Sequence, residues 1–296
     1  MSDNIQTIQV RDITEFLKYA MYSDYVFIDY EKHEMPINPV IVAPAGAGKT
    51  AIVDQYSDND GILVLSKITE WSLLKNYLDD MKTGKIKRIL IPDFVNPANM
   101  KAETVNSLIT FLNLYISWEG VRTVSTYAGH YPIAIKNPLR GSLMATMATN
   151  DFERMANALA ATGFLSRLII IGYFYSRDAV KQIMLDIVNN EFTWNRLHLK
   201  FPENRMQIQA CSKYTDRLIP YALDLGRKVQ GYDIRALQQM MLMCKARALS
   251  EGRDSVNGDD VDKVIYLFST YVLKVPRYDM DIKEQMNKEF VPLNKR

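Results

Sequence analysis

The segment Val40-Ile41-Val42-Ala43-Pro44-Ala45-Gly46-Ala47-Gly48-Lys49-Thr50-Ala51-Ile52-Val53 joins an apolar run, a glycine-containing turn and the start of a helical pattern. Residues 40–43 have the composition of a short buried strand, and residues 50–53 open a helix. This succession of strand, glycine loop and helix is the local context in which a phosphate-binding loop works. The segment therefore predicts the first strand and helix of an α/β fold with a phosphate site between them.

The turn carries the residue types that such a site needs. Gly46 and Gly48 allow backbone N–H groups to point inward around an anion. Lys49 is long enough to reach the β- and γ-phosphates of ATP, and the Thr50 hydroxyl suits Mg²⁺. The helix that begins here directs the positive end of its dipole at the phosphates. The residues expected to bind the nucleotide are Ala45, Gly46, Ala47, Gly48, Lys49 and Thr50.

A carboxylate for the magnesium side of the site is expected at the end of a neighbouring strand. Residues 88–91 (Arg-Ile-Leu-Ile) are a candidate buried strand, and Asp93 follows it after one proline. We expect Thr50 and Asp93 to share the metal site, and Asp93 is also a candidate catalytic residue. The alternative role for Asp93 is to cap the loop after the strand.

The carboxylate that activates the attacking water is less defined, because Phe94 stands where an Asp-Glu pair would have its glutamate. In one alternative Asp93 serves the metal and the base comes from elsewhere. In the other, Pro92 takes the metal position and Asp93 acts as the base. Glu103 and Glu119 are the nearest glutamates that could substitute, so the sequence leaves the base open.

Strand-type runs alternate with helical patterns through the first two thirds of the chain, which predicts a mainly parallel sheet covered by helices. Further strands are expected at 61–65, 88–91, 121–127, 133–135, 142–146 and 168–174, and helices at 13–24, 71–81, 102–118, 152–160 and 178–189. Residues 197–201 and 206–210 suggest two more short strands, and helical patterns follow at 213–229, 232–250 and 258–274. We therefore predict a P-loop NTPase core over residues 1–195 and a small helical domain over residues 196–296.

Composition places the chain among ordinary globular proteins. Of its 296 residues, 48% are hydrophobic and 24% charged, and the balance of 36 basic against 34 acidic residues gives a net charge of +2. A free-standing nucleic-acid-binding domain usually has a larger basic excess, so the charge neither supports nor excludes DNA. The chain has no apolar run of membrane-spanning length and no signal-peptide pattern, and we expect a cytoplasmic protein without a membrane partner.

The order of the polar positions resembles that of the AAA+ ATPases, and most closely that of the minichromosome-maintenance helicases and their phage or plasmid relatives. After the P-loop and Asp93, Asn150 ends an apolar run. Arg167 follows in the sequence Leu-Ser-Arg, just before a further apolar run. Arg235 lies in Asp-Ile-Arg-Ala-Leu, at the start of a predicted helix. The resemblance covers residues 38–275. It implies that Asn150 is the first sensor, Arg167 the arginine finger and Arg235 the second sensor, in a helical AAA+ lid.

Each of these assignments has a plainer alternative. Asn150 could cap a strand end, and Arg167 could make a surface ion pair, with Arg154 as a rival for the finger. Arg235 could lie on the solvated face of its helix.

The resemblance also implies a function, namely Mg²⁺-dependent ATP hydrolysis with an arginine supplied by a neighbouring subunit. We therefore expect a homo-oligomeric ring, with six subunits as the expected number. The implied role is a DNA-associated motor, either a helicase or a helicase loader of a mobile element. A hairpin near residues 121–138 could hold a DNA strand by charge and stacking, or could be purely structural. The alternatives are a remodelling chaperone with a protein partner and a nucleotide-controlled assembly switch with low turnover.

Overall fold

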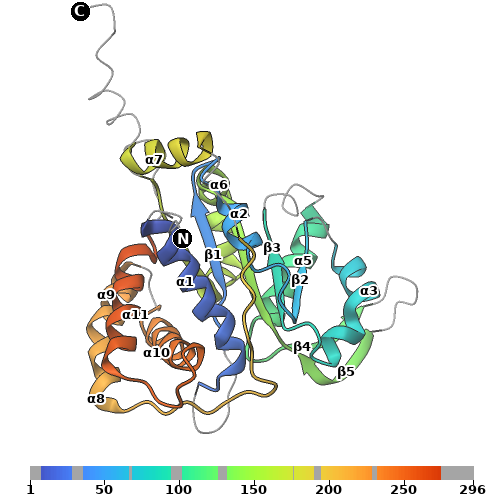
Figure 1. The fold of residues 1–296 in the computed structure, drawn as a ribbon. Coiled ribbons are helices and arrows are strands. Elements are labelled where there is room, and N and C mark those ends of the chain that lie inside the picture. Colours follow the sequence, from blue (N-terminus) through green and yellow to red (C-terminus); the bar gives the residue numbers. More distant parts are fainter. Residues whose placement is uncertain are drawn as a thin grey trace, which may run out of the picture.

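A five-stranded parallel sheet forms the centre of the molecule (Figure 1). The computed structural model describes residues 8–28, 36–66, 69–94, 102–125, 132–175, 177–189, 195–228 and 232–274. The strands are β1 (Pro39–Ala43), β2 (Ile62–Val64), β3 (Arg88–Ile91), β6 (Ser142–Ala148) and β7 (Ile169–Gly172), in the order β2-β3-β6-β1-β7. The predicted α/β class with a mainly parallel sheet is confirmed.

The strand sequences explain this arrangement, because parallel strands are covered on both faces and are apolar along their whole length. Every residue of β1, β3 and β7 is buried. Successive side chains of a strand point to opposite faces of its sheet. Accordingly, Ile41 and Ala43 enter one apolar core, whereas Val40 and Val42 enter the other.

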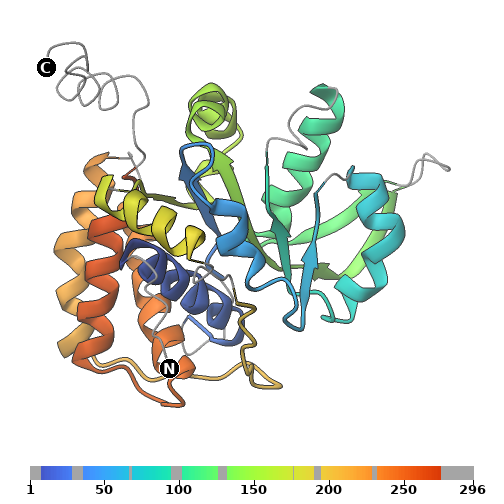
Figure 2. The same cartoon turned by 45° about the horizontal axis from the view of Figure 1, so that its top comes forward.

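Helices cover both faces of the sheet. Helices α3 (Glu70–Lys82), α5 (Ala102–Tyr115) and α6 (Thr149–Ala161) pack on the core that contains Val40. Helices α1 (Ile8–Tyr22) and α2 (Lys49–Asp54) pack on the core that contains Ile41, together with helices from the end of the chain. Figure 2 shows the two groups of helices on either side of the sheet.

A helical region follows the sheet in the chain, as predicted. It comprises α7 (Arg177–Val188), α8 (Ser212–Thr215), α9 (Ile219–Lys228), α10 (Asp233–Ser250) and α11 (Gly258–Tyr271). The N-terminal helix α1 packs against α10, and Asp12 of α1 accepts hydrogen bonds from Tyr266 (2.7 Å) and Tyr271 (2.9 Å) of α11. One apolar core therefore extends from the sheet into the helical region, and the division at residue 195 stays a prediction.

The predicted hairpin is present as β4 (Val121–Ser125) and β5 (Pro132–Leu139), which pair in antiparallel fashion. Its turn, with Tyr127, His130 and Tyr131, lies outside the described residues. The base of the hairpin packs closely on α5: the Gly141 N–H donates to the Tyr115 carbonyl, and a Cβ at Gly141 would lie 2.1 Å from the Tyr115 hydroxyl. The hairpin is thus fixed near the amino-terminal end of β6, which begins at the next residue.

The prediction of two short strands at 197–201 and 206–210 is wrong. This segment runs as an extended chain with isolated bridges, from Met206 to Val26 and from Gln209 to Ser255. The segment has the alternating composition of a strand, but it lies across α1 and the α10–α11 turn, where only single backbone pairs form. No helix among the described residues is long and apolar enough to cross a membrane.

Candidate functional site: a phosphate-binding loop at the carboxyl edge of the sheet

The glycine-containing turn connects β1 to α2 and has the conformation that its sequence predicts. Gly46 and Gly48 have φ angles of 77° and 75°, a region that is open to glycine and costly for other residues. A Cβ at Gly46 would meet no protein atom within 4 Å, so the space beside its backbone is open to a ligand. This open space is what a phosphate group would require, and the loop therefore fits a nucleotide.

Lys49, the first residue of α2, turns back over the loop. Its ammonium group donates to the carbonyl oxygens of Ala43 (3.0 Å) and Pro44 (2.8 Å). Burial lowers the pKa of Lys49, and the carboxylates of Asp93 and Asp151 act against that shift. The lysine is thus half-buried over the loop and within electrostatic range of two carboxylates.

The predicted metal residues are Thr50 and Asp93, and Thr50 contacts the residue that precedes Asp93. The Thr50 hydroxyl donates to the carbonyl oxygen of Pro92 (3.3 Å). The Phe94 N–H donates to the Thr146 carbonyl (2.9 Å), which fixes the chain around Asp93 against β6. A hydroxyl and a carboxylate are oxygen donors that suit Mg²⁺, which keeps several water ligands and needs only one or two carboxylates. The donor set fits Mg²⁺, although the described residues contain no group of three or more His, Cys, Asp and Glu placed to hold a metal ion.

Asn150 lies at the same edge of the sheet. Strand β6 runs between β1 and β3, pairing Ala148 with Ala43 and Ala145 with Ile91. The strand ends at Ala148, so Asn150 belongs to the first turn of α6, where it is exposed. The structure therefore brings Asn150 next to the loop, on a helix rather than on the strand.

Asp151, which the sequence analysis overlooked, is a second carboxylate in this first turn of α6. It pairs with Arg154 at 2.8 Å and acts electrostatically on Lys49. The signal that could have identified it is the run Thr149-Asn150-Asp151, where three polar residues follow the apolar strand. Arg154, the rival candidate for the finger, is thereby held at its own chain's loop.

The two glutamates considered as bases lie in different places. Glu103 is in the first turn of α5 and exposed, at the carboxyl edge but beyond β3. Glu119 lies between α5 and β4, near Gly120, which contacts Leu139 and Arg140 just before β6 begins. Since β6 has seven residues, roughly 23 Å of strand separates Glu119 from the loop. Glu119 is therefore excluded as a base for its own chain.

Arg167 also lies at the amino-terminal edge of the sheet. Its carbonyl oxygen accepts a hydrogen bond from the Asn38 side chain (3.3 Å), and the Asn38 carbonyl accepts from the Ile169 N–H (2.9 Å). Asn38 immediately precedes β1, whose five residues place Arg167 roughly 17 Å from the loop that follows the strand. Arg167 therefore does not reach the loop of its own chain.

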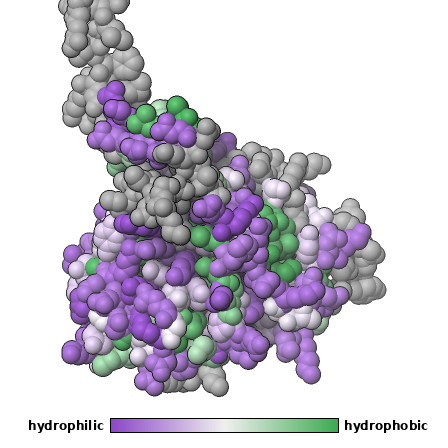
Figure 3. All heavy atoms as spheres, viewed as in Figure 1, coloured by the Kyte–Doolittle hydropathy of each residue, from purple (hydrophilic) through white to green (hydrophobic). Residues whose placement is uncertain are grey.

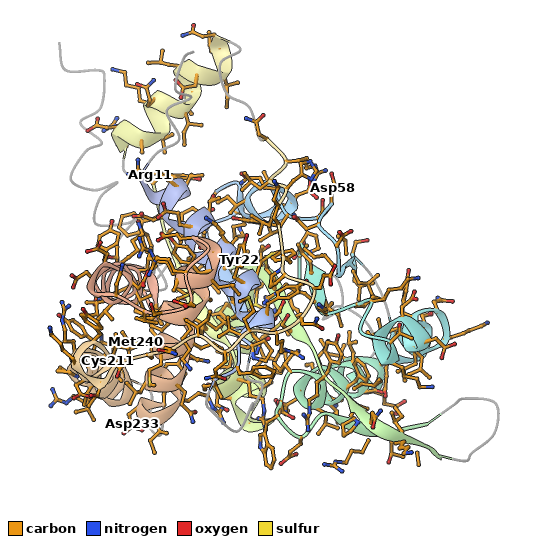
Figure 4. All side chains as sticks on the ribbon, turned by 60° about the horizontal axis from the view of Figure 1, so that its bottom comes forward. Arg11, Tyr22, Asp58, Cys211, Asp233 and Met240 are labelled. Carbon is orange, nitrogen blue, oxygen red and sulfur yellow. The ribbon has the colours of Figure 1, made fainter. Side chains whose placement is uncertain are left out.

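Arg235 lies beside Arg167 rather than beside the loop. Its guanidinium group donates to the main-chain oxygen (2.6 Å) and the hydroxyl (2.7 Å) of Ser166. Burial lowers the pKa of Arg235, and the positive charge of Arg167 lowers it further. Neither arginine has an ion-pair partner among the described residues. Figure 4 shows Asp233, two residues before Arg235, at the opposite end of the molecule from the yellow helix α7.

Two tyrosines that the sequence analysis did not consider support the loop from behind. The hydroxyl groups of Tyr173 (2.6 Å) and Tyr175 (3.1 Å) both donate to the carbonyl oxygen of Ala47. Burial raises the pKa of Tyr173, which keeps its hydroxyl protonated as a donor. Both residues follow β7, so the strand next to β1 helps to fix the loop.

No protein-family model matches the chain, and no curated protein matches it either.

Proposed function

We propose that this protein binds ATP at the loop between β1 and α2 and hydrolyses it. The observation that carries the proposal is the arrangement of the loop after β1 and Asp93 after β3, two strands that flank β6 in the sheet. The Thr50 hydroxyl bonds to the carbonyl oxygen of Pro92 beside Asp93, and Lys49 is half-buried over the loop. Binding requires Lys49 to exchange its bonds to Ala43 and Pro44 for the β- and γ-phosphates. The N–H groups of the loop and the amino end of α2 would hold the phosphate charge.

Thr50 and Asp93 would hold Mg²⁺, which when bound neutralises charge on the phosphate oxygens. Hydrolysis then needs an attacking water in line with the bond that breaks, and positive charge around the transferring phosphoryl group. Lys49 supplies part of that charge. Arg167 and Arg235 supply the rest only in a neighbouring subunit, because they lie at the far edge of their own sheet. An oligomer is therefore part of the proposal.

The resemblance to AAA+ ATPases supports the same assembly. It implies a ring, and six is the expected number of subunits. The surface of α7, on which Met184, Leu185, Ile187 and Val188 are 46–76% exposed, also supports an assembly. Figure 3 shows their region as green spheres at the top of the molecule, surrounded by purple. Exposed apolar patches of this kind mark interaction surfaces, and we assign this one to a second copy of the chain.

DNA is the proposed client, and the hairpin favours it. Arg122 of β4, Lys136 of β5 and Arg140 just beyond are exposed, and neither strand contains an acidic residue. A cationic hairpin suits a nucleic-acid backbone. The DNA-associated motor, a helicase or helicase loader, is accordingly the leading role.

A nucleotide-controlled assembly switch is the second candidate. It is favoured by Phe94, which occupies the position after Asp93 and is buried in the apolar core instead of offering a carboxylate. ATPase rates measured with and without single-stranded DNA, beside sizing with and without ATP, separate the roles. DNA stimulation supports the motor, and ATP-dependent assembly with negligible phosphate release supports the switch. Stimulation by a protein client alone would indicate a remodelling chaperone.

The binding site itself is tested by Lys49→Ala. This variant should weaken ATP binding at least tenfold, because it removes a charged hydrogen bond of about 1.5–3 kcal/mol to the phosphates of the bound nucleotide. Titration with a fluorescent ATP analogue measures the affinity. Lys85→Ala is the matched control, since Lys85 is exposed and pairs with Asp80 at 3.2 Å, away from the loop. Unchanged affinity in a folded Lys49→Ala protein would contradict the proposed site.

A further inference from the structure

We propose that Asp151 is the carboxylate that orients the attacking water and takes its proton in ATP hydrolysis. This proposal rests on the ATPase function proposed above and names the residue that this function lacks. Phe94 rather than a glutamate directly follows Asp93, and the structure excludes Glu119 as a base for its own chain.

The backbone places Asp151 at the reaction site. Strands β1, β6 and β3 are consecutive in the sheet, so the segments that follow them meet at one edge. The loop follows Ala43, Asp93 follows β3, and Asp151 follows Ala148, which is the register partner of Ala43. Asp151 is therefore on the segment that lies between the loop and Asp93.

The two carboxylates stand in different surroundings. Asp93 is next to Pro92, whose carbonyl oxygen accepts the Thr50 hydroxyl bond, and so lies on the side where the metal is expected. Asp151 lies in the first turn of α6, near enough to Lys49 to act on its charge. We assign Asp93 to the metal side and Asp151 to the side of the attacking water. Glu103 is a weaker candidate, since its helix α5 follows β3, whereas α6 with Asp151 follows β6, the strand that pairs directly with β1.

Arg154 is the positioning residue for this base. It pairs with Asp151 at 2.8 Å across three residues of the same helix, which limits the rotamers that the carboxylate can adopt. The Arg154 side chain is 61% exposed, so water screens the pair and the carboxylate keeps free lone pairs.

The step balances without another reactant. The water oxygen bonds to the γ-phosphorus, the bond from that phosphorus to the β–γ bridging oxygen breaks, and ADP leaves with the electron pair. One proton of the water passes to an Asp151 oxygen and is then released to phosphate or solvent. The products are ADP and inorganic phosphate.

Asp151→Asn tests the assignment, because it keeps the shape of the side chain and removes the base. Loss of a general base costs about 10²–10⁴ in rate, so kcat should fall by that factor while ATP affinity stays within about threefold. Glu103→Gln is the matched control and should retain the wild-type kcat. Arg154→Ala should lower kcat with little change in KM, and Arg154→Lys should restore part of it.

The outcomes separate this inference from the function on which it rests. Wild-type protein that binds ATP but releases no phosphate, with every DNA tested, overturns both. If the Asp151→Asn variant hydrolyses ATP with the kcat of the wild-type protein, only the assignment of Asp151 is overturned. If the asparagine variant does not bind ATP, Asp151→Ser provides the same test with a smaller side chain that suits the first turn of a helix.

Discussion

Arg167→Ala should bind ATP as the wild-type protein does and hydrolyse it about 10³–10⁵ times more slowly. The reason is the contact proposed above with the nucleotide of a neighbouring subunit, since Arg167 at the amino-terminal edge of the sheet does not reach the loop of its own chain. Arg235→Ala should resemble it, because the Arg235 side chain donates to Ser166 while the Arg167 side chain donates to the nearby Gly163 carbonyl, so both cations lie in one place. Steady-state phosphate release and nucleotide titration give the two measurements. Arg227→Ala, an exposed position at the end of α9, is the control.

A mixing experiment decides whether the arginine acts between subunits. Lys49→Ala keeps Arg167 but lacks a working loop, and Arg167→Ala keeps the loop but lacks the finger. Mixed oligomers should recover part of the activity, since some interfaces combine an intact loop with an intact arginine. Proven co-assembly without any recovery would show that Arg167 has a structural role.

Arg88→Ala should destabilise the fold by about 3–5 kcal/mol, because it leaves a buried carboxylate without its partner. Arg88 is 1% exposed and contacts both carboxylate oxygens of Asp24 at 3.0 Å. It also donates to the carbonyls of Ala20 (2.6 Å), Ile37 (3.1 Å) and Leu143 (3.3 Å). One side chain thereby joins α1, the residues before β1 and strand β6 to β3. Burial raises the pKa of Asp24 against the effect of Arg88, so the carboxylate depends on this arginine.

Urea unfolding measures the loss of stability. Lys85→Ala, which breaks an exposed pair with Asp80, should change the free energy of unfolding by at most about 1 kcal/mol. The double variant Arg88→Met with Asp24→Leu should be more stable than Arg88→Ala, since it removes both charges from the interior. An Arg88→Ala protein within 1 kcal/mol of wild type would refute the role of the pair.

The sequence predicted the sheet well because its strands are continuous apolar runs. Strand β3 was predicted at its observed bounds, and β1 within one residue, since nothing but burial decides their conformation. The segment 197–210 failed for the opposite reason. Its apolar and polar residues alternate as in a strand. Its neighbours in space, however, are the end of α1 and the turn after α10, which only the tertiary structure brings together.

The candidate site was predictable where the chemistry lies within one motif. Residues 45–50 form a single turn, and their backbone conformation follows from two glycines. The partners from distant segments were harder to assign. The strand pattern does not distinguish Asp151 from Asn150, because the start of α6 at Thr149, which shifts both residues out of the strand, depends on the packing of the helix. Arg167 and Arg235 lie near each other in space but far apart in the sequence, so no local sequence pattern predicts their proximity.

The two tyrosine hydroxyls on the Ala47 carbonyl have a consequence for the energetics of binding. In a planar trans peptide, the carbonyl and the following N–H point in opposite directions. With the Ala47 oxygen held toward Tyr173 and Tyr175, the Gly48 N–H points away from these two side chains before any ligand arrives. The peptide plane is therefore preorganised, and less conformational entropy remains to be lost when an anion binds.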